Sequence, residues 1–277
     1  MAKPPGKCIF CGSGGLTKEH IWSEWTYKLV PKDPINSRTI HKVKTSRATK
    51  IVEQSANVVQ GTSNSMRVRA VCSGCNSGWM SSLDNQAIPL LTPLIARQEF
   101  RLDSTESLRL IATWVSMKLM VAEFIERATV STTEYERDWL RHKLEPPLNW
   151  HVWACDIQPG TKWETGYYRE SAGLFLLPEE PGAPLPPTGI KNPNTQSVTI
   201  GIGRLLFHVI ASTAPGYVIS DRYPMGGNTI AKIWPPKGVV IWPPRVTLTN
   251  EGADHISVSL SRFIASKITV FVPDTSF

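Results

Sequence analysis

The sequence predicts a mixed α+β protein in two parts, residues 1–95 and residues 96–277. Segments in which apolar and polar residues alternate, as they do in strands, occur in both parts, and residues 108–125 repeat apolar side chains at helical spacing. A hydrophobic content of 41% with ten tryptophans is enough to fill a core. We therefore expect a small N-terminal module, then a helix pair, then a region rich in strands.

In residues 1–95 the sequence predicts two strands and a helix. Residues 16–22 read as a short strand, and residues 66–71 alternate with period two, which places Arg67 and Arg69 on one face. Residues 76–90 have helical spacing, with Pro89 marking the expected end. Residues 32–65 are polar and are expected to form a long loop with short strand pieces.

The second part begins with the clearest helix signals. Residues 103–106 offer a capping box before the apolar helix 108–125, and residues 131–134 start a second helix that ends before Pro146. Further along, apolar and aromatic segments predict strands. These segments are residues 149–177, 197–202, 204–211, 227–233 and 238–241.

Two Cys-x-x-Cys pairs lie in the first part. They are Cys8 with Cys11 and Cys72 with Cys75, whereas Cys155 stands alone and reads as a core residue. Each pair lets two thiolates reach one ion from a single turn, and four thiolates form the tetrahedral set that Zn²⁺ prefers. The sequence therefore predicts one structural zinc, which would stabilise a module with little core of its own.

Positive charge is concentrated beside these cysteines. Residues 1–80 carry a net charge of +8 and the remaining residues carry −1, within a total of +7. A basic surplus on one module is typical of proteins that bind polyanions, although an ordinary solvated surface has the same composition. Lys18, Lys42, Arg67 and Arg69 are the candidate contacts to phosphate.

Three motifs in this order resemble the HNH endonuclease family, which has the ββα-metal fold: Cys8-x-x-Cys11, Glu19-His20-Ile21 and Cys72-x-x-Cys75-Asn76. The match is closest to a bacterial and prophage-borne group in which the second pair continues as Cys-Asn-x-Gly-Trp-Met, here residues 75–80. The helix with Trp114 and Lys118 is similar to one in that group. The resemblance covers residues 8–90 and implies a role in phage biology or in defence against phage.

The resemblance implies a role for each matched residue. His20 would be the general base, and Glu19 and Asn76 would hold a catalytic Mg²⁺ or Mn²⁺. Two positions depart from the family pattern. Glu19 stands where Asp is usual, and Arg67 stands where many members have an Asn that Asn57 or Asn64 could replace.

These observations predict a metal-dependent endonuclease that hydrolyses DNA. A zinc-stapled nucleic-acid-binding module without catalysis is the alternative, and a structural or partner-binding protein is a third hypothesis. We expect a cytoplasmic protein, since the first residues lack the apolar segment of a signal peptide and no run is long enough to span a membrane. The C-terminal region is also a candidate surface for binding a protein partner or for forming a homo-oligomer.

Overall fold

The computed structural model confirms a mixed α+β fold. It describes residues 6–30, 38–47, 50–53, 58–60, 66–176, 193–219, 230–266 and 270–271. The helices and helical turns are η1 (Glu24–Lys28), α1 (Ser73–Cys75), η3 (Asn76–Met80), α2 (Ser81–Ile95), α3 (Thr105–Ala122), η4 (Glu123–Ile125), η5 (Arg127–Thr129), α4 (Glu134–Lys143), η6 (Lys162–Thr165), α5 (Asn250–Ser257) and α6 (Ser259–Ser266). In this part of the chain no helix combines the length and the apolarity needed to cross a membrane.

A curved central sheet forms the middle layer, and its strand order is β12-β7-β11-β10-β8-β2-β3. Along this order neighbouring strands are antiparallel except for β2 and β8, which are parallel. Two further strands join the sheet, β14 parallel to β7 and β4 antiparallel to β2. The strands of the chain are β1 (Leu16–His20), β2 (Arg38–Arg47), β3 (Lys50–Glu53), β4 (Val58–Gln60), β5 (Arg67–Cys72), β6 (Phe100–Leu102), β7 (Trp150–Ile157), β8 (Tyr167–Ala172), β9 (Phe175–Leu176), β10 (Thr195–Ile202), β11 (Leu205–Ser212), β12 (Ala231–Trp234), β13 (Val240–Trp242), β14 (Thr247–Leu248) and β15 (Val270–Phe271).

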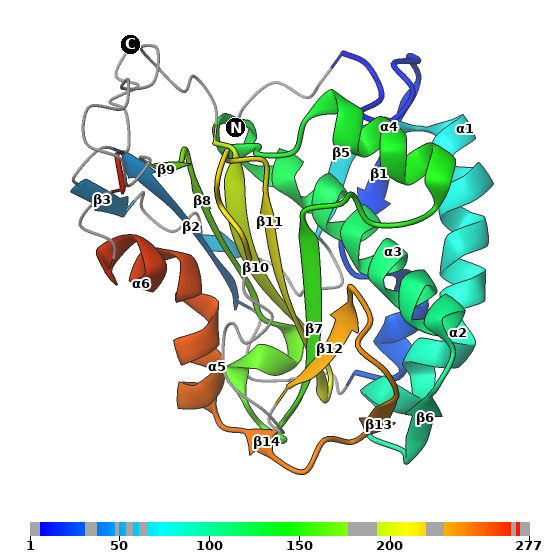
Figure 1. Ribbon diagram of the computed structural model, residues 1–277. Helices are drawn as coiled ribbons and strands as arrows, with labels where there is room; N and C mark the ends of the chain where they lie inside the picture. Colours follow the sequence, from blue (N-terminus) through cyan, green and yellow to red (C-terminus); the bar gives the residue numbers. More distant parts are fainter. Residues whose placement is uncertain are drawn as a thin grey trace.

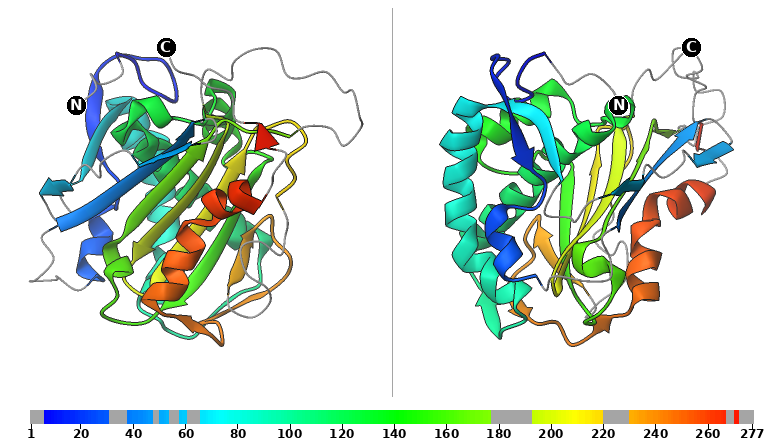
Figure 2. Two further views of the ribbon diagram at one scale, coloured as in Figure 1. Left: turned by 90° about the vertical axis from the view of Figure 1, so that its left-hand side faces the viewer. Right: turned by 180° about the vertical axis from the view of Figure 1, so that it is seen from behind.

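Helices cover both faces of this sheet. The views agree that α2 and α3 lie on one face and that α5 and α6 lie on the other (Figures 1 and 2). The long helix α3 is buried along most of its length, as its apolar sequence predicts. It begins at the N-cap Ser104, whose side chain accepts a hydrogen bond from the Ser107 backbone, and α4 begins with a capping box between Thr133 and Glu136.

The strands β1 and β5 form a separate antiparallel pair beside α2 and α3 (Figure 1). The hydrophobic core continues from this pair, through α2 and α3, to the near face of the central sheet. The strand β2 lies in the chain between β1 and β5, yet it belongs to the central sheet. The boundary expected near residue 95 therefore does not separate two cores, and as a domain limit it stays a prediction.

Helix α2 corrects one expectation. Pro89 does not end it, because α2 continues to Ile95 and contains both Pro89 and Pro93. Leu91, Leu94 and Ile95 are buried beyond the first proline. Their packing favours continuing the helix despite the backbone hydrogen bond that a proline removes.

The far face of the sheet holds a buried histidine, His208 on β11. Its Nδ1 lies 2.8 Å from Thr199 Oγ1 and its Nε2 lies 3.2 Å from Ser259 Oγ. Burial lowers the pKa of His208 to about 3. Complete burial between two hydroxyl groups gives His208 a structural role in the sheet.

We expect His208 to make the protein less stable in acid. Its folded pKa lies below the unfolded value of 6.5, so its contribution is present above pH 6.5 and is lost as pH falls toward 3. One proton contributes about 1.4 kcal/mol per pH unit to the slope. Urea unfolding of His208→Gln should show a shallower slope of stability against pH between 6.5 and 4, whereas His142→Gln, at an exposed position on α4, should keep the wild-type slope.

Candidate functional site

Four cysteine thiols meet at the end of the β1–β5 pair. The Sγ atoms of Cys8, Cys11, Cys72 and Cys75 all lie within 4.8 Å of one another, close enough to hold one metal ion. No other such group of His, Cys, Asp and Glu side chains occurs among the described residues. Four sulfur ligands are compatible with a structural zinc. Cys155 lies apart from them, buried in β7, as its sequence context predicts.

The local backbone explains why the thiols converge. Cys8 N donates to Ser13 O and Gly12 N donates to Cys8 O, which closes a tight turn. Gly12 has a φ of 73°, a conformation that a residue with a Cβ atom adopts at a cost. Ile9 N donates to Ala70 O on β5, so this turn is fixed directly to the strand that ends at Cys72.

The thiols differ in their acidity. Hydrogen bonds from Ser13 lower the pKa of Cys11 to about 6, whereas burial raises the pKa of Cys72 and of Cys75. A metal binds thiolates, so occupying this cluster requires the buried thiols to release protons. Metal affinity at the cluster is therefore expected to fall as the solution becomes more acidic.

Glu19 and His20 occupy the last two positions of β1. Their side chains leave the strand in opposite directions because neighbouring residues alternate in a strand. Glu19 is buried, and its Oε1 lies 2.6 Å from Nζ of Lys118 on α3. His20 lies on the outer face of β1, opposite Arg67 on the neighbouring strand β5.

His20 is held by two neighbours. Its Nδ1 lies 2.7 Å from the Tyr27 hydroxyl and its Nε2 lies 3.1 Å from Glu24 Oε1. The Tyr27 hydroxyl donates to Trp22 O, so it is placed to accept a hydrogen bond from Nδ1, whereas the Glu24 carboxylate is placed to accept one from Nε2. A neutral ring carries hydrogen on only one of these two nitrogens. Burial, and after it the Arg67 guanidinium, lowers the pKa of His20, so the ring is neutral at pH 7.

Asn76 begins the helical segment that follows the second cysteine pair. The segment opens as a π-helical turn, Asn76–Met80, with a non-helical Gly78, before α2 starts. Asn76 Nδ2 donates to Thr17 Oγ1 on β1, 3.1 Å away. The cysteine cluster thus lies where the strand with Glu19 and His20 meets the segment with Asn76.

The structure adds two residues that were not assigned to the site from the sequence. Asp84 on α2 accepts hydrogen bonds at Oδ1 from Ser23 Oγ and Trp114 Nε1, both 2.6 Å away, and its Oδ2 lies 3.4 Å from Lys118 Nζ. Lys118 itself is buried between Asp84 and Glu19. Spacing could have placed Lys118 one turn after Trp114, but it could not show that both reach the same carboxylate.

A pocket of about 330 Å³ adjoins these residues. Hydroxyl, amide and carboxylate groups line it, from Thr17, Ser73, Asn76, Ser77, Ser81 and Asp84. Glu19, His20 and Asn76 each hydrogen-bond to a different partner, and the pocket lies on the Asn76 side of β1. Oxygen atoms of this kind are the ligands that Mg²⁺ prefers. The oxygen atoms that line the pocket, from Asn76, Asp84 and the hydroxyl groups, therefore fit a hard divalent cation, whereas Glu19 does not line it and pairs with Lys118.

Three of the four basic residues predicted to contact phosphate lie on the β1–β5 strand pair. Lys18 pairs with Arg69 across the strands, and His20 pairs with Arg67, so these side chains share one face. Lys18, Arg67 and Arg69 are exposed. Lys42 lies on β2 in the central sheet, opposite Tyr168, and its side chain falls outside the described part. Asn57 and Asn64 also lie outside it.

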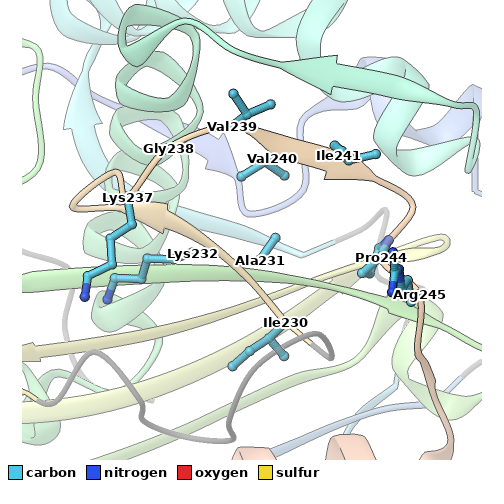
Figure 3. A pocket seen from close by; sticks show the side chains of 10 residues that line it. All are labelled: Ile230, Ala231, Lys232, Lys237, Gly238, Val239, Val240, Ile241, Pro244 and Arg245. Atoms are coloured by element: carbon cyan, nitrogen blue, oxygen red, sulfur yellow. The ribbon is translucent and has the colours of Figure 1, made fainter.

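A second pocket of about 330 Å³ lies in the C-terminal half. Lys232, Lys237 and Arg245 line it together with apolar residues between β12 and Pro244 (Figure 3). Lys232 Nζ lies 3.7 Å from the centre of the Trp153 ring and 2.7 Å from His151 Nδ1. None of these residues belongs to the site predicted from the sequence.

Searches among protein-family models, curated proteins and solved structures found no match to this chain.

Proposed function

We propose that the protein is a metal-dependent endonuclease of the HNH type, with a structural zinc at the four cysteines and DNA as its substrate. The observation that carries the proposal is the position of the cysteine cluster, which joins the strand ending in Glu19-His20 to the helical segment beginning with Asn76. The order strand, strand, helix around that cluster supports a ββα-metal module.

The proposed chemistry assigns a separate task to each group. His20 takes the proton of the attacking water, and the Glu24 carboxylate, 3.1 Å from Nε2, stabilises the imidazolium that forms. Glu19 and Asn76 would hold a Mg²⁺ or Mn²⁺ ion, with Asp84 as a further oxygen group beside them. Such an ion, when bound, stabilises the negative charge that develops on the phosphate.

The basic face of the β1–β5 strand pair supports DNA as the substrate. Lys18, Arg67 and Arg69 surround His20 on an exposed face, so a phosphate backbone lying across it would place phosphates near the proposed base. The opposite face of β1 is directed toward Lys118 and the helices.

The test is a nicking assay on supercoiled plasmid. We expect the zinc-loaded protein to convert supercoiled DNA to open-circular or linear DNA in Mg²⁺ or Mn²⁺ and to be inactive in buffer without either ion. Salt-dependent DNA binding with no cleavage in any divalent cation would favour the non-catalytic binding module instead. Neither binding nor cleavage would favour a structural or partner-binding protein.

A further inference from the structure

Lys118 is an unusual residue for the interior of a helix. It lies on α3 with a side chain that is 2% exposed, and its ammonium group contacts two carboxylates. Glu19 Oε1 is 2.6 Å away and Asp84 Oδ2 is 3.4 Å away. The two carboxylates come from different elements, β1 and α2. Lys118 therefore connects the strand and the helix of the proposed site through charge.

The charges in this cluster do not balance. Two carboxylates face one ammonium group, which leaves a net charge of −1 in a largely buried place. Asp84 cannot readily turn away, because Ser23 and Trp114 hold its other oxygen. Buried charge is costly unless it is paired, so the cluster favours one more cation.

The pocket beside the cluster could admit that cation. Asp84 lines it together with the Asn76 amide and several hydroxyl groups, and its volume is about 330 Å³. A cation at this edge would contact Asp84, one of the two carboxylates that face Lys118, and would lie beside the ion pair between Lys118 and Glu19. The ammonium and an incoming ion of like charge repel each other, so the presence of Lys118 weakens cation binding.

We propose that Lys118 is a built-in counter-cation that competes with the divalent cation for Glu19 and Asp84 and thereby sets the affinity of the site for that cation. This inference rests on the proposed function, which identifies the site. In the absence of the cation, Lys118 keeps the two carboxylates together and the module folded. When the cation is present, it shares them with Lys118.

A purely structural ion pair makes a different prediction. If Lys118 served stability alone, its removal would lower stability and leave cation affinity unchanged. Competition predicts that its removal raises the affinity. The two roles are therefore separated by a binding measurement on the zinc-loaded protein, without any assay of cleavage.

The experiment is isothermal titration calorimetry with Mg²⁺ on four proteins whose clusters carry three different charges. Lys118→Met makes the cluster −2, the wild type and the double variant Lys118→Met with Asp84→Asn are −1, and Asp84→Asn is neutral. We expect about tenfold tighter binding for Lys118→Met and about tenfold weaker binding for Asp84→Asn, with the double variant near the wild type. Lys118→Arg should keep the wild-type affinity.

Lys162→Met is the matched control. It also removes an ammonium group from a carboxylate, because Lys162 Nζ lies 2.7 Å from Asp254, but this pair is exposed and remote from the site. We expect it to bind Mg²⁺ as the wild type does. If Lys118→Met fails to fold, the comparison of Asp84→Asn with the double variant isolates the loss of the ammonium group.

Equal affinity in the wild type and Lys118→Met, or in Asp84→Asn and the double variant, would overturn the counter-cation role and leave the proposed nuclease untouched. An absence of Mg²⁺ and Mn²⁺ binding by every protein in the set would instead overturn the catalytic cation of the proposed function. The two failures give different results in the same titrations.

Discussion

Replacing His20 by alanine is expected to reduce plasmid cleavage by about 10²–10⁴-fold, the usual contribution of a general base. The physical reason is that His20 is a ring with a lowered pKa, able to accept a proton, on the basic face of the β1–β5 pair. The measurement is the initial nicking rate in Mg²⁺ under single-turnover conditions. DNA binding should change little, because Lys18, Arg67 and Arg69 remain.

The control for this substitution is His142→Ala. His142 is an exposed histidine on α4, and its Nε2 contacts Asp138. This variant should cleave at the wild-type rate. Elemental analysis and thermal unfolding of the His20 variant should show unchanged zinc content and a folded protein. Wild-type cleavage by a correctly folded His20→Ala protein would remove His20 from the proposed mechanism.

The sequence was most informative where local signals act alone. The starts of α3 and α4 depend on neighbouring residues, and the structure confirms both starts. The capping box expected over residues 103–106 does not form, because Ser104 is the N-cap and accepts from Ser107, whereas α4 has a capping box between Thr133 and Glu136. The apolar pattern of α3 likewise predicted its burial. The spacing of the four cysteines predicted a shared metal site, and the structure brings the thiols together.

Tertiary packing decided the features that the sequence did not indicate. Pro89 is a local stop signal, but the burial of Leu91 and Leu94 favours continuing α2. Strand β2 pairs with β8 across more than a hundred residues, which no local pattern encodes. Helices α5 and α6 were not expected at all, since each has eight residues and adjoins segments that read as strands.

The site likewise combines residues that the sequence indicated with residues that only tertiary packing brings together. Glu19, His20 and Asn76 were assigned to the site because their order relative to the two cysteine pairs resembles the motifs of the HNH family. Asp84 and Lys118 lie 34 residues apart and meet because α2 packs against α3. A charged residue inside an apolar helix was the available signal for Lys118, but its partners follow from the fold. Its contact with Glu19 is therefore the main addition to the predicted site.

Replacing Cys75 by serine is expected to remove the bound zinc and to destabilise the N-terminal module severely. A structural zinc contributes on the order of 10 kcal/mol to the folding of small metal sites, so losing one ligand should cost several kcal/mol. Elemental analysis should fall from one zinc per chain toward none, and thermal unfolding should begin at a lower temperature. Cleavage should disappear as well, although Cys75 takes no part in the proposed chemistry.

Cys155→Ser separates this effect from the general cost of replacing a buried thiol. Cys155 is fully buried in the central sheet, away from the cluster, so its replacement should lower stability and keep one zinc per chain. A Cys75→Ser protein that retained a full zinc equivalent would rule out the four-cysteine site. If the variant instead loses zinc and cleavage while the central sheet stays folded, the thiolates act by holding β1 against the segment that begins at Asn76. That outcome would place the role of zinc in positioning, because the proposed catalytic groups are untouched by the substitution.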